Sequence, residues 1–316
     1  MGEQGQKTRV FVAGATGMVG SAIVRRLKRS DGYEILRGPA PRADLRNQQQ
    51  ANDLIQSLKP DWVFLAAARV GGIYANNTFP AQFIYDNLTI ETNVLHAAYC
   101  NGVRKLLFLG TACMYPRLAP QPIKEEYLLS GYLEPTNEPY AVAKIAGLIM
   151  ARSYNRQYGT HFISVMPTNL YGPNDNFDLQ NSHVVPALLR KFHEAKRDGV
   201  GSVEVWGSGN ASREFLHVDD LADAGLFLME TYDSNEIINI GTGRETTIRE
   251  LAETIKEIVG FQGELRFNTE AADGMPRRVL DVSRLAELGW HPSITLKEGL
   301  TATYRWFLEH EDRLRK

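Results

Sequence analysis

A glycine-rich turn between a short apolar strand and a helix is the feature that most constrains this fold. Residues 9–13 (R-V-F-V-A) have the composition of a buried strand, and 19–27 carry apolar residues at helical spacing. Between them stands G-A-T-G-M-V-G, whose glycines permit a tight turn and a close approach of the backbone to a ligand. The helix that follows offers free N–H groups to a phosphate. The pattern predicts a dinucleotide site at this turn; a tight connection without a ligand is the alternative.

The first half of the chain continues this alternation of strands and helices. We expect further strands at 33–36, 62–67, 105–109 and 161–166, and helices at 89–99 and 140–158. After Pro167 an Asn/Asp-rich loop leads to more helices, and we expect the strand at 237–240 to return to the sheet. Strands separated by helices form parallel sheets with right-handed crossovers. The prediction is an α/β fold: a Rossmann-like doubly wound parallel sheet with a smaller, interleaved C-terminal substrate-binding domain.

Composition and charge exclude several classes of function. The chain has 35 basic and 37 acidic side chains and a formal charge of -2, which argues against a nucleic-acid-binding or polybasic membrane-surface protein. Two cysteines, Cys100 and Cys113, are too few for a disulfide scaffold and offer no metal-ligand spacing, so we expect no metal. Residues 1–7 are polar, with no apolar signal core behind them. We therefore expect a cytoplasmic protein without a membrane or nucleic-acid partner.

The helix at 140–158 carries a pair of residues suited to acid–base chemistry. Tyr140 and Lys144 stand four residues apart, on one helical face. A phenol with a pKa near 10 needs a neighbouring cation to act at neutral pH, and Lys144 can supply it and also reach a ribose hydroxyl. Thr111 follows the strand at 105–109, at the strand end where parallel sheets bind ligands. These residues form a candidate triad; a helix-surface pair and a threonine without a role are the alternatives.

The end of the second strand indicates which dinucleotide binds. NAD-selective sites place a carboxylate there for the ribose 2′-hydroxyl. This chain has Arg37 instead, and no carboxylate until Asp44. Because a guanidinium suits a 2′-phosphate, NADP(H) is predicted, with Asp44 and Leu45 beside the adenine. The alternative is that Arg37 is an ordinary solvated residue.

The glycine turn, Thr111, Tyr140 and Lys144 together resemble the extended short-chain dehydrogenase/reductase family. Within it, the likeness is strongest to members that epimerise C3 and C5 of GDP-4-keto-6-deoxy-D-mannose and reduce C4 with NADPH. The stretches that carry this likeness are 66–81, 133–144, 166–177, 181–195 and 213–220. The chain departs from the family pattern at Thr111-Ala112, where two serines are usual, and at Ala15-Thr16 in the glycine turn.

The resemblance implies catalytic roles for five residues. Cys113 and His183 match the family's epimerisation pair, with a thiolate as base and an imidazolium as acid; a core cysteine and a satisfied histidine are the alternatives. Tyr140 is expected to donate a proton to the C4 oxygen. Thr111 would share that oxygen, and Lys144 would tune Tyr140.

The resemblance also implies the binding positions. Those for NADP(H) are Gly14, Ala15, Thr16, Gly17, Met18, Val19, Gly20, Arg37, Asp44, Leu45, Ala66, Ala67, Ala68, Leu109, Gly110, Tyr140, Lys144, Pro167, Asn169, Leu170 and His183. Those for the GDP-sugar are Asn169, Lys191, Trp206, Arg213 and Asp273. The expected domains are an NADP-binding Rossmann domain, 1–170 and about 213–242, and a nucleotide-sugar-binding domain, about 171–212 and 243–316. A homodimer through helices at about 89–100 and 140–158 is also implied.

Two other functions stay open at this point. A related GDP-4-keto-6-deoxy-sugar epimerase or reductase, for instance one acting on a heptose, would use the same triad and nucleotide pocket. A non-catalytic NADP-binding protein of the same fold would not need to keep its tyrosine, lysine, cysteine and histidine together.

Overall fold

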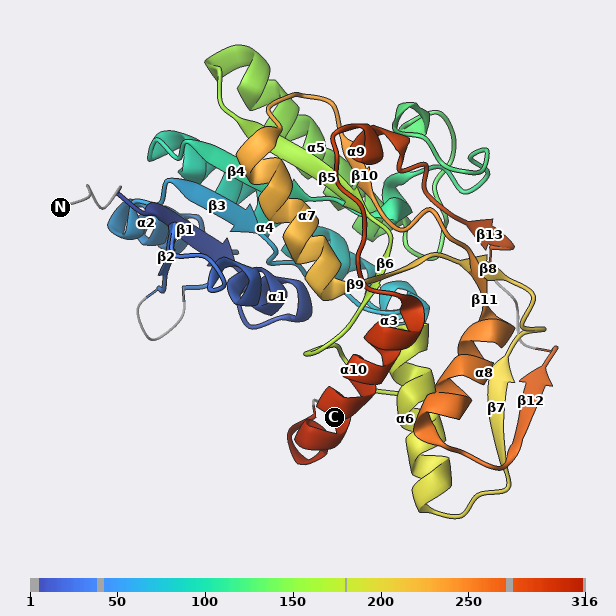
Figure 1. The fold of residues 1–316 in the computed structure, drawn as a ribbon. Helices are drawn as coiled ribbons and strands as arrows, with labels where there is room; N and C mark the ends of the chain where they lie inside the picture. Colours follow the sequence, from blue (N-terminus) through green and yellow to red (C-terminus); the bar gives the residue numbers. More distant parts are fainter. Residues whose placement is uncertain (1–5, 39–42, 180, 271–274, 315–316) are drawn as a thin grey trace.

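A parallel sheet forms the centre of the molecule (Figure 1). The computed structural model describes residues 6–38, 43–179, 181–270 and 275–314. In this part of the chain the sheet has six strands, in the spatial order β2 (Tyr33–Leu36), β1 (Thr8–Ala13), β3 (Trp62–Leu65), β4 (Lys105–Leu109), β5 (Phe162–Pro167) and β10 (Ile238–Ile240). Every neighbouring pair is parallel. The predicted doubly wound parallel sheet is confirmed, and the strand near 237–240 joins it beside β5 as expected.

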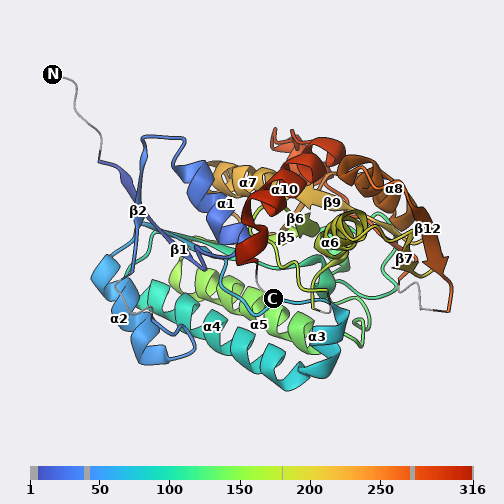
Figure 2. The ribbon, with the colours of Figure 1, turned by 90° about the horizontal axis from the view of Figure 1, so that it is seen from below.

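Helices cover both faces of this sheet (Figure 2). One face carries α1 (Met18–Leu27) and α7 (Val218–Thr231), and the other carries α2 (Gln48–Leu58), α4 (Pro80–Cys100) and α5 (Glu138–Tyr158). Because both faces are covered, the strands are apolar throughout rather than alternating; β4 is buried from Leu106 to Leu109. Helix α4 begins nine residues before the expected helix at 89–99, at a proline that fits the first helical turn.

Several segments after residue 171 form a second layer of structure at one end of the sheet (Figure 1). Its elements are α6 (Val184–Arg197), α8 (Ile248–Val259), α10 (Leu296–His310), β7 (Ser202–Trp206) and β12 (Glu264–Asn268). They share an apolar core that includes Phe192, Ile255 and Phe307. Helix α8 begins at a capping box of Thr247 and Glu250, which sets the start of this amphipathic helix.

Short elements connect the two parts. They are α3 (Ile73–Thr78), β6 (Asn169–Tyr171), β8 (Ser212–Arg213), β9 (Phe215–His217), β11 (Thr246–Thr247), β13 (Arg277–Arg278), α9 (Ser283–Glu287) and the 3-10 helices η1 (Ala112–Met114), η2 (Glu125–Tyr127) and η3 (Glu311–Arg313). Strand β8 lies between β11 and β13, and β6 pairs with β9. None of the helices in the described ranges is long and apolar enough to cross a membrane.

The buried carboxylate of Glu214 holds three of these connecting segments together. Its side chain is 0 % exposed. One oxygen accepts from the amides of Thr242 at 2.5 Å and Gly243 at 2.7 Å, and the other accepts from the Leu280 amide at 2.8 Å. Glu214 therefore fixes the turn after β10 and the segment after β13 to the junction between β8 and β9.

We predict that Glu214→Ala strongly destabilises the fold. The change leaves three amides without their acceptor, and each unsatisfied buried donor costs about 1–3 kcal/mol. Thermal unfolding followed by circular dichroism should show a melting temperature lower by roughly 10 °C or more. Glu236→Ala is the control, because its carboxylate is 67 % exposed and its ion pairs are 4.0 Å long; a Glu214 variant that melts with this control would contradict the prediction.

Candidate active site

The glycine turn lies at the point where the strand order reverses. Strands β2 and β3 flank β1 on opposite sides, and open parallel sheets bind ligands at such a switch point. Gly14 has a φ of +85°, and a Cβ there would meet the backbone of Ala66 and Ala67 at 2.8 Å. A Cβ on Gly20 would overlap the carbonyl group of Gly14. The turn therefore needs its glycines, and with the free N–H groups of α1 it fits the pyrophosphate of a dinucleotide.

A second group of the predicted cofactor residues lies where other strands of the sheet end, at this same edge. Ala66, Ala67 and Ala68 follow β3. Leu109 ends β4 and Gly110 follows it, Pro167 ends β5, and Asn169 and Leu170 begin β6. The parallel direction of the strands brings these residues to one side of the sheet, although they are separated by up to about a hundred residues in the chain.

The end of β2 carries the predicted selectivity residue. Arg37 is exposed and has no hydrogen bond or ion pair with another described residue. Asp44 is held by Arg46, which donates to its carboxylate at 2.9 Å and lowers the pKa of Asp44. Arg46 also contacts Asp86 on α4 at 3.3 Å. Arg37 is thus free to meet a phosphate, whereas the Asp44 carboxylate already has a partner that the sequence analysis did not foresee.

Tyr140 and Lys144 lie on α5, as predicted, but Lys144 has an unexpected partner. The Lys144 ammonium is 2.9 Å from the carboxylate of Glu91 on α4 and donates to the Leu109 carbonyl oxygen at 3.0 Å. Burial raises the pKa of Tyr140, and the charges of Cys113 and Glu91 raise it further. This direction is opposite to the lowering expected from Lys144, so the structure favours the protonated phenol, a proton donor.

Thr111 and Cys113 lie directly after β4. The Thr111 hydroxyl oxygen accepts from the Cys113 amide at 3.3 Å and caps η1, so its own proton is left to donate elsewhere. The Cys113 sulfur lies 3.5 Å from a guanidinium nitrogen of Arg278 on β13. Cationic neighbours favour the thiolate form of cysteine. The sequence analysis missed Arg278, because no local motif links it to a residue 165 positions earlier.

His183 stands at the N-terminal cap of α6. Its side chain is solvent-exposed, yet the surrounding protein lowers the pKa of His183 by desolvation. The positive end of the α6 dipole acts in the same direction. The imidazolium expected from the sequence is therefore not the favoured form, and Arg278 is the cation that contacts Cys113.

The described residues predicted to bind the substrate lie on the second layer and on the short elements that connect it to the sheet. Arg213 on β8 pairs in register with Arg278 on β13, which places it one strand away from the residue that contacts Cys113. The Lys191 ammonium lies 5.3 Å from the centre of the Trp206 ring, and that ring is 70 % exposed. Burial lowers the pKa of Lys191. Asn169 donates to the Glu214 carbonyl oxygen at 2.9 Å. Asp273 lies outside the described residues.

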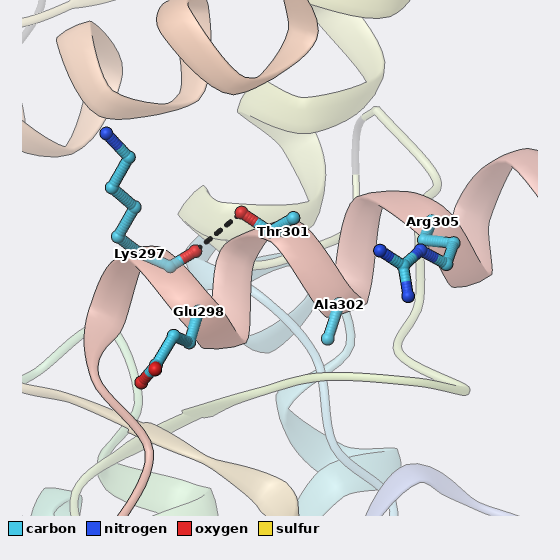
Figure 3. Close-up of a pocket in the computed structure, with 5 residues that line it drawn as sticks. All are labelled: Lys297, Glu298, Thr301, Ala302 and Arg305. Atoms are coloured by element: carbon cyan, nitrogen blue, oxygen red, sulfur yellow. Dashed lines mark hydrogen bonds between the residues drawn. The ribbon is translucent and has the colours of Figure 1, made fainter.

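A separate hollow on α10 does not belong to this site. Figure 3 shows its lining side chains, which all come from that one helix: Lys297, Glu298, Thr301, Ala302 and Arg305. None of the predicted site residues lines it.

A parallel sheet with a glycine turn at its switch point and a Tyr–Lys pair on the adjoining helix defines the class of dinucleotide-dependent oxidoreductases and epimerases. The chain belongs to the NAD dependent epimerase/dehydratase family, whose model matches residues 10–241. It is 54 % identical to the GDP-L-fucose synthase of Escherichia coli over 98 % of this chain and 99 % of that one. It is also 54 % identical to GDP-L-fucose synthase 1 of Arabidopsis thaliana over 96 % of this chain and 94 % of that one.

Solved structures show the same fold along nearly the whole chain. The GDP-L-fucose synthetase of Naegleria fowleri bound to NADP superposes with a TM-score of 0.92 at 30 % identity, covering 98 % of this chain and 97 % of that one. The GDP-6-OMe-4-keto-L-xylo-heptose reductase of C. jejuni superposes with a TM-score of 0.90 at 40 % identity, covering 96 % of this chain and 98 % of that one.

The loop after β6 contains a carboxylate that makes stability depend on pH. The Asn174 side chain of this loop donates to the Ser21 hydroxyl of α1 at 2.9 Å. One oxygen of the neighbouring Asp175 is buried without a hydrogen-bond partner among the described residues. Burial raises the pKa of Asp175 to about 7, against the opposing effect of the Asn176 amide.

We predict that Asp175 destabilises the protein as the pH rises toward 8. Its folded pKa lies above the unfolded value, so between about pH 4 and pH 7 the folded state binds more protons and stability falls with rising pH. Asp175→Asn should reduce the difference in melting temperature between pH 5 and pH 8 by a few degrees. The same difference in Asp178→Asn serves as the control, and an Asp175 variant that behaves like it would refute the assignment.

Proposed function

We propose that this chain converts GDP-4-keto-6-deoxy-D-mannose to GDP-L-fucose, by epimerisation at C3 and C5 and NADPH-dependent reduction at C4. The observation that carries the proposal is that Tyr140, the proposed proton donor for reduction, and Cys113, the proposed base for epimerisation, lie near each other. Cys113 lies close enough to Tyr140 for its charge to raise the pKa of that phenol. The 54 % identity to a GDP-L-fucose synthase along nearly the whole chain supports this chemistry. The similarity to a GDP-L-fucose synthetase structure bound to NADP supports NADP(H) as the cofactor.

Epimerisation rests on Cys113 and His183. The C4 ketone acidifies the C–H bonds at C3 and C5, so the Cys113 thiolate can take the proton while the electron pair moves onto the C4 oxygen as an enolate. His183, once protonated, returns a proton to the opposite face of the carbon. Arg278, 3.5 Å from the sulfur, supports the thiolate during this step.

Reduction rests on Tyr140, Thr111 and Lys144. When bound, NADPH supplies the hydride to C4. Tyr140 donates a proton to the C4 oxygen as its charge develops, and its raised pKa keeps the phenol protonated until then. The free hydroxyl proton of Thr111 stabilises the same oxygen. Lys144 orients the nicotinamide ribose.

The second layer would hold the GDP end of the substrate. We infer the division proposed from the sequence: an NADP-binding body of 1–170 and about 213–242, and a nucleotide-sugar body of about 171–212 and 243–316. A bidentate guanidinium such as Arg213 suits a diphosphate. The exposed Trp206 ring, with Lys191 above it, suits a guanine.

We also propose a homodimer through α4 and α5. These helices pack side by side on the outer face of the sheet (Figure 2). Their outer surface exposes the apolar side chains of Tyr85, Val142 and Ile149, between 39 % and 65 % exposed. A second copy would cover this apolar surface.

The runner-up function is reduction or epimerisation of another GDP-4-keto-6-deoxy-sugar, such as a heptose. The similarity to the C. jejuni heptose reductase favours keeping it as a candidate. A panel of GDP-keto-sugars with NADPH, with products identified by NMR, separates the two. Turnover of any of them excludes a non-catalytic NADP-binding role.

We predict that the two chemical steps fail independently. Cys113→Ala should lose exchange of the C3 and C5 protons with D₂O, while NADPH binding persists. Tyr140→Phe should still exchange, because the base is intact, but NADPH oxidation should fall about 10²–10⁴-fold, the weight of one general acid. Deuterium uptake by NMR and NADPH absorbance measure the two steps.

The matched control is Cys100→Ala, which removes the other, exposed cysteine and should behave as the parent protein. If Cys113→Ala exchanges deuterium at the parent rate, the base has been misassigned. If Tyr140→Phe reduces at the parent rate, the donor is another group.

We predict that cofactor selectivity depends on Arg37. Arg37→Ala should raise the KM for NADPH about ten- to a hundredfold, the weight of one charge-assisted phosphate contact. The KM for NADH should stay nearly unchanged, because NADH lacks the 2′-phosphate. Arg29→Ala, also exposed, is the control. Equal losses with both cofactors would show that Arg37 does not contact the phosphate.

A further inference from the structure

The buried ion pair between Glu91 and Lys144 joins α4 to α5 directly behind the site. Both side chains are almost fully buried, with Glu91 0 % and Lys144 2 % exposed. Their charged atoms are 2.9 Å apart. Apart from this ion pair, neither oxygen of Glu91 has a hydrogen-bond partner among the described residues. Among the described residues, the carboxylate therefore has one polar contact, which is the Lys144 ammonium.

The surroundings of the pair are shaped to admit that carboxylate. A Cβ on Gly147 would overlap a carboxylate oxygen of Glu91 and would meet the Phe108 ring at 2.7 Å. The glycine thus leaves the space that Glu91 occupies. The Phe108 ring lies 5.0 Å from the Lys144 ammonium and closes another side.

Two of the three N–H groups of the Lys144 ammonium already have partners in the protein. An ammonium has three N–H groups. One faces Glu91 and a second donates to the Leu109 carbonyl oxygen at 3.0 Å. Leu109 ends β4, at the edge that carries the proposed cofactor site. One N–H remains, and the two fixed contacts determine its direction.

The negative charge of Glu91 stabilises the buried Lys144 ammonium. A buried ammonium without a countercharge is costly and loses its proton readily. Among the described residues, the ion pair of Lys144 is with Glu91 on α4, and Tyr140 stands about one helical turn earlier on α5. The charges of Cys113 and Glu91 act on Tyr140. Burial raises the pKa of Glu91, and Lys144 opposes that rise. Of the described groups whose charge acts on Tyr140, both Glu91 and Cys113 favour its protonated form.

We propose that Glu91 is a positioning residue for the reaction: its carboxylate holds the Lys144 ammonium and directs the one remaining N–H toward the cofactor ribose. The inference rests on the proposed function, in which Lys144 orients that ribose. Glu91 itself touches neither cofactor nor substrate, and acts through Lys144.

The test compares Glu91→Gln and Glu91→Asp with the parent protein. NADPH affinity is measured by fluorescence titration, which needs no keto-sugar, and the pH profile of kcat for reduction is measured separately. Glu91→Gln should bind NADPH roughly tenfold more weakly, the weight of one charge-assisted contact. As the pH is raised, kcat for reduction in Glu91→Gln should begin to fall at a lower pH than in the parent protein. Glu91→Asp, which keeps the charge, should retain the parent pH profile with an intermediate affinity.

Glu125→Gln is the matched control, because that carboxylate is also buried at 7 % exposure but accepts from the Asn239 amide. It should lower the melting temperature and leave NADPH affinity and the pH profile unchanged. If Glu91→Gln does the same, its role is structural and the proposal is wrong. If Glu91→Gln does not fold, Glu91→Asp carries the test, and parent-like NADPH affinity in that variant would overturn the proposal. A parent protein that binds NADPH but converts no GDP-keto-sugar would refute the proposed function. The effect of the Glu91 variants on NADPH affinity would still stand.

Discussion

The common direction of the strands is the constraint on which the site depends. Parallel strands joined by right-handed crossovers all end at the same edge of the sheet. The glycine turn after β1, the alanines after β3, Thr111 after β4 and Asn169 after β5 therefore meet. Helices cover both faces of the sheet and shield its strands from water (Figure 2).

Burial, rather than nearby cations, sets the protonation states in this site. Tyr140 is surrounded by protein and by groups that carry negative charge, so its phenol stays protonated. The same desolvation favours neutral His183. The cations are placed where they serve as partners instead: Lys144 against Glu91, and Arg278 beside the Cys113 sulfur. A phenol that donates a proton to a reduced carbonyl needs this state.

The short strands that connect the sheet to the second layer bring distant side chains together through their register, and no sequence motif marks these contacts. Strands β8 and β13 place Arg213 beside Arg278, and Arg278 reaches back to Cys113. The carboxylate of Glu214, directly after β8, accepts hydrogen bonds from the amide of Thr242 after β10 and from the amide of Leu280 after β13. Cys113, the proposed base, is thus linked to the proposed diphosphate contact by residues about 100 positions and more away from it in the chain.

The sequence by itself determined the parallel sheet, the glycine turn and the pairing of Tyr140 with Lys144 on one helical face, because all three follow from local periodicity and spacing. It also determined that Arg37 stands where a carboxylate would select NAD. Only the tertiary structure decided that Glu91 contacts Lys144 and that Arg278 contacts Cys113. It also decided that the pKa of Tyr140 is raised and that of His183 is lowered, each opposite to expectation. Contacts across distant segments and the loss of water around a side chain are properties of packing, and no local pattern encodes them.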